Sequence, residues 1–223
     1  MSDVSTTPEA DPVAVWHEDL QNARMRGDRA ALRRAQTPAD ADGIGALYTL
    51  LWSWKPGIPR GSFTNSMVEI AARTALAVAM IDTDTTPEPD TPPDGKEAAA
   101  TQTGETTPQK KKIRNGDALG RALAALDPRR NDKNPRYSQD RLRRLLSAED
   151  PDEFLRLLRS AILQLDRAAP VTDVSRVMEA WHHPDARAKV RRQIFLSYFA
   201  ALPLPDSIET PDTTDTTDAG DDQ

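Results

Sequence analysis

Arginine side chains are the groups in this sequence whose type and spacing best support a chemical role. Basic residues gather in four short stretches, which are Arg24, Arg26, Arg29, Arg33 and Arg34; Arg141, Arg143 and Arg144; Arg156 and Arg159; and Lys189, Arg191 and Arg192. The planar guanidinium group donates two parallel hydrogen bonds to a phosphate, so these stretches favour contact with a nucleic-acid backbone without base readout. Any single arginine is explained equally well by a solvated helix face with local Glu–Arg pairs, but several such stretches together indicate a phosphate-binding surface.

A second candidate for nucleic-acid contact is the pair Trp52 and Trp54, which lies close to Lys55 and Arg60. Aromatic rings beside basic groups form stacking platforms for unpaired bases. Tryptophans at helical spacing more often belong to the core, so both interpretations stay open.

Patterns typical of enzymes are absent from the sequence. The chain has three histidines, His17, His182 and His183, and no cysteine. Adjacent histidines on a helix point in different directions and make a poor chelating pair. The sequence contains no Gly-rich phosphate loop, nucleophile elbow or zinc-protease motif. We therefore expect no catalysis, no metal and no cofactor, and the lack of cysteine fits a reducing cytoplasm.

The formal net charge of −6 over 223 residues is unevenly distributed. Residues 1–12, 82–109 and 203–223 together hold 17 acidic residues and one base, Lys96. Their composition offers too little apolar surface to offset the entropy of ordering, which predicts disorder. The remaining residues hold 18 acids and 28 bases, a net charge of +10. A basic folded core with acidic segments points to a polyanionic partner, most commonly nucleic acid.

The elements that must position these groups are helices, because the apolar spacing is helical nearly everywhere outside the acidic segments. The sequence predicts an all-α fold of about nine helices in two small bundles joined by a disordered acidic Thr/Pro-rich linker. Helix starts are indicated at Asp11-Pro12, Thr37-Pro38, Ser62 or Thr64, Ser138, Asp150-Pro151, Asp173 and His183-Pro184. The expected boundaries are a disordered N-terminus (1–12), an N-terminal bundle (13–81), a linker (82–112), a C-terminal bundle (113–202) and a disordered acidic tail (203–223). No apolar run is long enough for a membrane span, and no secretory signal is visible.

The second bundle carries a family resemblance. The element Leu119-Gly-Arg-Ala-Leu123 is followed by the arginine-bearing leucine helix of 141–148, by Leu157-Leu-Arg159 and by Trp181. Trp16, Leu32-Arg-Arg34 and Trp54 to Arg60 precede them in matching order. This arrangement resembles the CasB family, the small subunit of the type I-E CRISPR surveillance complex Cascade. The resemblance covers roughly 12–81 and 113–202.

The resemblance implies a non-catalytic, two-bundle helical subunit that binds other Cascade subunits (backbone and large subunit) and a second copy of itself. Such a subunit braces the guide-RNA filament, and its basic face holds the guide RNA–target DNA heteroduplex and the displaced single strand. The resemblance implies that the nucleic-acid-binding residues are those that match basic family positions, namely Arg33, Arg34, Arg60, Arg121 and Arg159. We add Arg141, Arg143 and Arg144 to this set because they lie in a locally basic stretch. The long linker and acidic tail depart from the family pattern, as does Asp150-Pro151, where relatives keep a base.

Two other classes of function remain open. A stand-alone helical DNA-binding regulator would need a recognition helix, for which Thr172 to Trp181 is the nearest candidate. A purely protein-binding scaffold would use its arginines for acidic partners.

Overall fold

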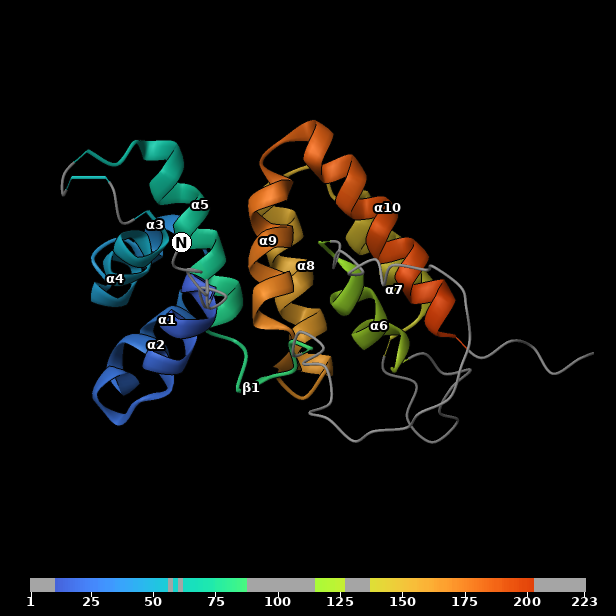
Figure 1. The fold of residues 1–223 in the computed structure, drawn as a ribbon, viewed down its shortest axis with the longest axis horizontal. Helices are drawn as coiled ribbons and strands as arrows, with labels where there is room; N and C mark the ends of the chain where they lie inside the picture. The colour runs from blue at the N-terminus through green and yellow to red at the C-terminus, as the bar shows by residue number, and fades with distance from the viewer. Residues whose placement is uncertain (1–10, 56–57, 60–61, 88–114, 127–136, 203–223) are drawn as a thin grey trace, which may run out of the picture.

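The computed structural model describes residues 11–55, 58–59, 62–87, 115–126 and 137–202, and the chain is helical over most of them (Figure 1). The α-helices in these ranges are α1 (Pro12–Gln21), α2 (Arg26–Arg34), α3 (Pro38–Ala41), α4 (Gly45–Trp54), α5 (Asn65–Val78), α6 (Asp117–Ala124), α7 (Gln139–Ser147), α8 (Pro151–Gln164), α9 (Val171–Trp181) and α10 (Pro184–Ala201), with a 3₁₀ turn at Ala23–Met25. The predicted all-α fold is confirmed. None of these helices is long and apolar enough to cross a membrane.

Most helices begin where the sequence indicated, because a side chain accepts a hydrogen bond from the first free backbone N–H groups. Asp11, Thr64, Ser138 and Asp150 each make this contact at a helix start. At the start of α3, Thr37 and Asp40 form a reciprocal capping box. The structure therefore confirms these five predicted helix starts.

Two sequence-based expectations for helix starts differ from the structure. The segment after Thr37-Pro38 was expected to form one helix, but it forms α3 and α4, separated at Gly43, whose φ is +88°. A left-handed φ is open to glycine and ends the first helix there. Asp173 does not begin a helix either, since α9 starts at Val171 and Asp173 is buried within it.

Helices α5 and α9 form the centre of the molecule. The last eight residues of α5, from Ala71 to Val78, are all buried, and eight of the eleven residues of α9 are buried as well. The small alanine side chains of α5 allow close packing of its neighbours. On one side Trp16 of α1 donates a hydrogen bond from Nε1 to the carbonyl oxygen of Ala46 in α4, at 2.9 Å.

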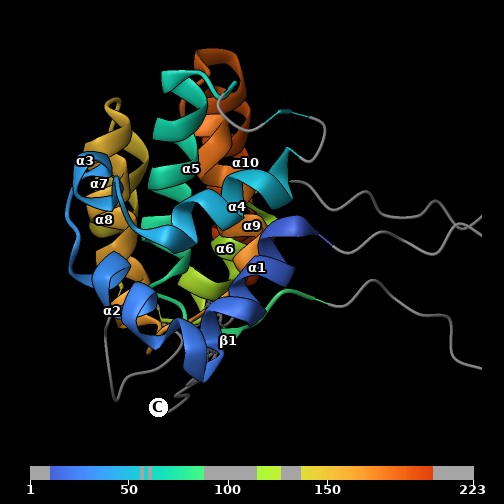
Figure 2. The ribbon, with the colours of Figure 1, turned by 90° about the vertical axis from the view of Figure 1, so that its left-hand side faces the viewer.

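The helices of the first half and those of the second half lie side by side, with α5 facing α8 and α9 (Figures 1 and 2). One continuous set of buried residues runs through both halves. Arg73 of α5, almost fully buried, links them because its Nε lies 2.7 Å from Asp152 Oδ1 at the start of α8. The division into two bundles with the boundaries given above remains a proposal.

A short parallel strand pair joins the halves at the end of the molecule where α2 lies (Figures 1 and 2). Strand β1 (Thr83–Asp84) pairs with β2 (Ala168–Ala169). The sequence predicts that residues 82–87 belong to the disordered linker, but in the structure they are ordered and include β1. Asp84 accepts a hydrogen bond from the backbone N–H of Val171, so these residues are fixed to the start of α9.

Candidate nucleic-acid interface

The predicted arginines fall into two groups, those with an exposed guanidinium and those that bind the protein's own backbone. Arg159 of α8 belongs to the second group. Its Nη1 lies 2.5 Å from the carbonyl oxygen of Ala35, and its Nη2 lies 2.7 Å from that of Arg33. The C-terminal carbonyls of a helix lack intrahelical partners, and Arg159 supplies donors to the end of α2. Burial lowers the pKa of the Arg159 guanidinium. Arg159 therefore joins α8 to α2.

Arg33 is likewise held by the protein, in what we call the Asp82 cluster, which consists of Asp82 and the side chains of Arg29, Arg33 and Arg167. Arg33 Nη2 lies 2.5 Å from Asp82 Oδ1, Arg29 also binds this oxygen, and Arg167 Nη1 lies 3.9 Å from Oδ2. Burial raises the pKa of Asp82, but the hydrogen bond and charge of Arg33 and the charges of Arg29 and Arg167 outweigh it, so the pKa is lowered. Three guanidinium groups around one carboxylate leave a local excess of positive charge.

Arg34 and Arg144 belong to the exposed group. Arg34 lies in the last turn of α2 and Arg144 in the last turn of α7, and both are exposed. Within the described part of the chain, neither side chain has an ion pair or hydrogen-bond partner. Such a guanidinium keeps all five of its donors available to a ligand.

The rest of α7 has the amphipathic form that the sequence predicted. Leu142 and Leu145 are buried, while the arginines between and beside them are exposed. Arg143 pairs with Asp140 at 3.3 Å, and both side chains are largely solvated, so this ion pair is weak. Arg141 donates a hydrogen bond to Gln164 Oε1 of α8 at 2.7 Å.

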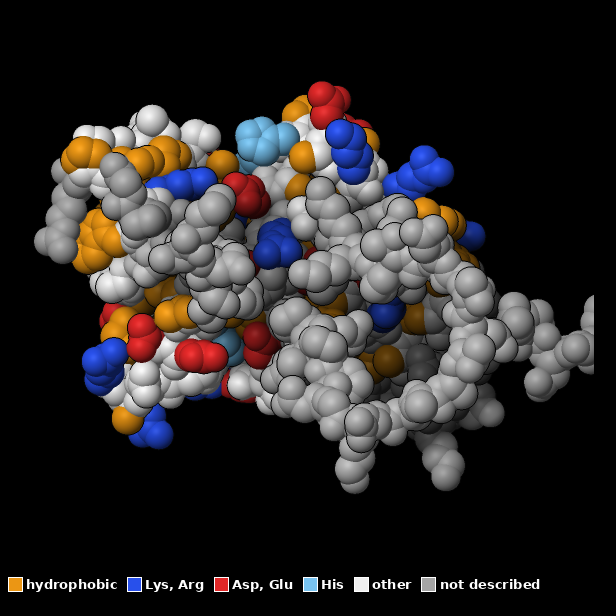
Figure 3. Space-filling model, in the orientation of Figure 1, with side chains coloured by type: hydrophobic (Ala, Val, Ile, Leu, Met, Phe, Trp, Pro, Cys, Tyr) orange, Lys and Arg blue, Asp and Glu red, His pale blue; other side chains and the backbone are white. Residues whose placement is uncertain are grey.

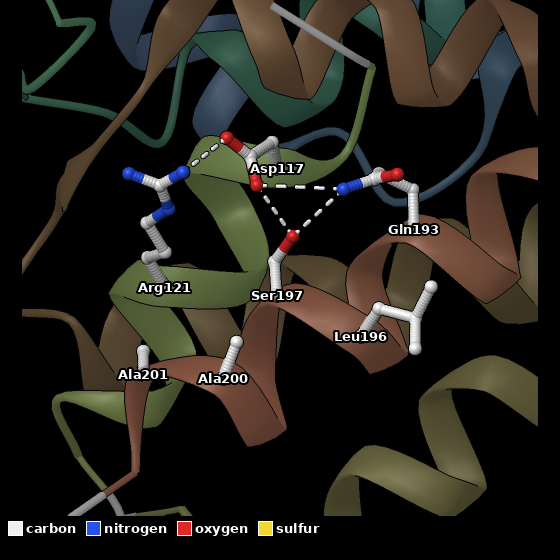
Figure 4. A pocket seen from close by; sticks show the side chains of 7 residues that line it. All are labelled: Asp117, Arg121, Gln193, Leu196, Ser197, Ala200 and Ala201. Atoms are coloured by element: carbon white, nitrogen blue, oxygen red, sulfur yellow. Dashed lines mark hydrogen bonds and ion pairs between the residues drawn. The ribbon is translucent and has the colours of Figure 1, made fainter.

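Arg121 of α6 lies in a surface pocket of about 500 Å³ between α6 and α10 (Figure 4). Its Nη2 lies 2.6 Å from Asp117 Oδ2. The other oxygen of Asp117 accepts hydrogen bonds from Ser197 Oγ, at 2.5 Å, and from Gln193 Nε2, at 3.4 Å. Asp117 therefore partly neutralises Arg121, and the polar groups of this pocket bind each other.

The element Leu119-Gly-Arg-Ala-Leu123, which contains Arg121, is a packing element. Leu119 and Leu123 are fully buried, and Gly120 lies directly against the backbone of α10. Gly116 N and Leu119 N donate hydrogen bonds to the two carboxylate oxygens of Asp173, at 2.6 and 2.8 Å. Asp173 thus caps α6 from a different helix.

Basic residues of α10 also serve the backbone. Arg191 Nη2 and Arg187 Nη1 each lie 2.5 Å from a carbonyl oxygen at the end of α7, Ala148 and Glu149 respectively. The guanidinium of Arg191 stacks 5.2 Å from the ring centre of Trp181. Neither Arg187 nor Arg73 is among the arginines predicted from the sequence. For Arg187, one feature of the sequence could have indicated this role. The connection between α7 and α8 before Asp150-Pro151 is short, so its backbone carbonyls need hydrogen-bond donors from another part of the chain.

Charge on the face drawn in Figure 3 is mixed, since the coloured Lys and Arg side chains lie at separate points and several have Asp or Glu beside them. Arg60, another predicted site residue, lies outside the described residues. Trp52 is 38% exposed, whereas Trp54 packs against the core with Lys55 Nζ 5.2 Å from its ring centre. The described ranges contain no group of three or more side chains able to hold a metal.

The helix that the sequence offers as the nearest recognition helix of a stand-alone regulator is buried in the structure. The nearest candidate, Thr172 to Trp181, lies in α9, whose buried residues include Val174, Val177 and Met178. A helix covered on most of its surface by α1, α5, α8 and α10 cannot enter a DNA groove.

Comparison with known families gave one result. Residues 28–199 match the family model described as CRISPR-associated protein Cse2. No curated protein and no solved structure matches the chain. The match spans both halves of the fold and contains all eight predicted arginines, of which Arg60 lies outside the described residues.

Proposed function

Because this chain belongs to the Cse2 family, the small subunit of the type I-E CRISPR complex Cascade, we propose that it is a non-catalytic strand-holding subunit. In this role it braces the guide-RNA filament and contacts the phosphates of the guide–target heteroduplex and of the displaced DNA strand. Its partners are the backbone and large subunits and a second copy of the chain. Cascade membership follows from the family, whereas the strand contacts are our proposal.

The observation that carries the proposal is the pair of exposed, unpaired guanidiniums of Arg34 and Arg144, supported by the weakly paired Arg143. A hydrogen bond to phosphate is most favourable when the donor does not first have to break a hydrogen bond to another acceptor. Formation of an R-loop exchanges one duplex for another of similar stability, so a few backbone contacts are enough to favour it. No base readout by the protein is needed.

The geometry divides the other predicted residues by role. We assign Arg33 and Arg159 to positioning, since their donors bind the carbonyls of Ala79, Ala35 and Arg33 itself. Arg141 and Arg121 are bound to Gln164 and Asp117, so we assign them positive charge but no direct phosphate contact. Direct phosphate contact is assigned to Arg34, Arg143 and Arg144.

The test uses assembled Cascade carrying Arg34→Ala, Arg144→Ala or both, with Arg176→Ala as the control. Arg176 is an exposed arginine of α9 that pairs with Asp11 at 3.2 Å. Each test variant should assemble normally. Each single variant should lower the log–log salt slope of target binding by about 0.7–0.9, and the double variant by about twice as much. The control should leave the slope nearly unchanged.

The opposite result would be loss of assembly with an unchanged salt slope among the complexes that form. That result would favour a protein-binding scaffold, in which the arginines bind acidic surfaces of other subunits.

A further inference from the structure

Residues 203–223 carry acidic side chains at a regular interval. Six of the seven acids stand at every third position from 206 to 221, and the seventh is Asp222; the segment contains no base. The six are Asp206, Glu209, Asp212, Asp215, Asp218 and Asp221. Three residues of a fully extended chain span roughly 10 Å, so this spacing corresponds to about one negative charge per 10 Å of extended chain.

The place where this segment leaves the fold is set by the packing of α10 on α6. A Cβ atom on Gly116 would lie 3.3 Å from the carbonyl oxygen of Val190, and one on Gly120 would lie 2.6 Å from that of Ile194. The two helices therefore run in the same direction, and their C-terminal ends are neighbours. Arg121 and Ala201 line the same pocket (Figure 4).

The start of α7 lies at the same end of α6. The backbone N–H of Tyr137 donates a hydrogen bond to the carbonyl oxygen of Leu126, at 3.1 Å, just beyond the C-terminal end of α6. Ser138 then caps α7, which exposes Arg143 and Arg144. The 21 residues after Leu202 can reach up to roughly 70 Å when extended, far more than the distance to α7 requires.

We propose that residues 203–223 bind the exposed arginines of α7 and compete there with nucleic acid. Two observations identify this segment as the ligand of α7. Its charge is opposite to that of the arginines, and it is attached to the fold next to the start of α7. The competition rests on the proposed function, because it requires that α7 bind phosphates, whereas the contact of the segment with α7 does not.

The charge spacing sets the strength of this competition. Single-stranded DNA presents one phosphate charge per about 3.4 Å of its strand, roughly three times the density of residues 203–223. A tethered segment nevertheless acts at an effective concentration on the order of millimolar. It should therefore displace short, loosely held strands and itself be displaced by a strand that the assembled complex holds in place. The effect is selectivity against nonspecific nucleic acid.

Contact is tested first, without any nucleic acid. The chain has no cysteine, so Thr214→Cys accepts a single nitroxide label in the full-length protein. Amide NMR signals of Arg143 and Arg144 should broaden, while those of α1 serve as the reference. Broadening should vanish in about 1 M salt, where the Debye length is about 3 Å.

Two full-length controls separate charge from sequence. Changing the seven acids to Asn or Gln should abolish the broadening, whereas a scrambled segment of the same composition should retain it. Absence of broadening in the native chain, or equal broadening with the neutral segment, would overturn the proposal.

Competition is then measured with a fluorescent 20-nucleotide oligothymidylate. Deleting residues 203–223 should tighten its binding about two- to tenfold at low salt, as expected for removal of a weak internal competitor. Equal Kd values with and without the segment would overturn the competitive role. If neither chain binds the oligonucleotide, the proposed phosphate contact of α7 fails, and the label experiment still decides whether the segment binds this helix.

Discussion

Gly120 of α6 lies against the main chain of α10 so closely that a Cβ atom placed on it would be 2.6 Å from the carbonyl oxygen of Ile194. The same atom would lie 2.9 Å from Ser197 Cβ and 3.2 Å from the backbone nitrogen of Tyr198. Two of these three neighbours are backbone atoms, which cannot move without shifting the helix. A glycine at position 120 is therefore required for the packing of α6 on α10.

Gly120→Ala should destabilise the protein by about 1–3 kcal/mol, because overpacking outweighs the gain in helix propensity. Gly27→Ala in α2 is the matched control, since an added Cβ there meets nothing within 4 Å. The control should stabilise the protein by about 0.5–1 kcal/mol. Urea unfolding of both variants measures the difference, and equal effects would contradict the packing argument.

Arg159→Met should destabilise the protein by about 1–3 kcal/mol, because it leaves the carbonyl oxygens of Arg33 and Ala35 without their donors. Arg156→Met, one turn earlier on α8, removes an exposed arginine that pairs with Glu153 at 3.8 Å. The control should cost less than about 1 kcal/mol. Thermal unfolding distinguishes them, and similar Tm values would return Arg159 to the set of direct phosphate contacts.

Asp173→Asn should detach the start of α6 from α9. The carboxylate accepts from Gly116 N and Leu119 N, whereas an amide has only one acceptor oxygen and would point its NH₂ group at the other donor. We expect a loss of about 1–3 kcal/mol. The specific readout is amide hydrogen exchange, which relative to the parent protein should become faster in α6 than it does in α8. Asp140→Asn, at an 88% exposed side chain, is the control that should change neither quantity.

The sequence predicted those parts of the fold that depend on neighbouring residues. Helix caps such as Ser138 and Asp150 act within three residues, and the buried faces of α7 and α8 follow from apolar spacing. The prediction of a single helix after Thr37-Pro38 was wrong, because apolar periodicity does not reveal a residue with a left-handed φ such as Gly43.

The candidate site was harder to predict, because the roles of its arginines depend on distant partners. Arg159 binds a carbonyl 124 positions earlier in the chain, and Asp173 caps residues 54 and 57 positions away. An arginine three positions from another on a helix has the same sequence pattern whether it meets solvent, as Arg156 does, or a helix end. Only the packing of α8 beside α2 separates these cases.

The imidazole of His182 should make stability depend on pH between about 4 and 6.5. Burial, together with the smaller effects of the charges of Arg73 and His183, lowers the pKa of His182 to about 4, against opposing effects of Glu69 and Asp152. Its Nε2 atom is buried without a hydrogen-bond partner in the described residues.

The sign follows from proton binding. In the unfolded chain the pKa of His182 lies near 6.5, so between pH 6.5 and 4 the unfolded state holds a proton that the native state does not. The native state is therefore fully stable with respect to this group above pH 6.5 and loses stability as the pH falls toward 4. His182→Gln removes the titration, so its Tm should fall less between pH 7 and pH 4.5 than that of the parent protein. Parallel Tm profiles for the parent and His182→Gln would show that the lost stability comes from other groups, such as the carboxylate of Asp82, whose pKa is lowered in the folded protein.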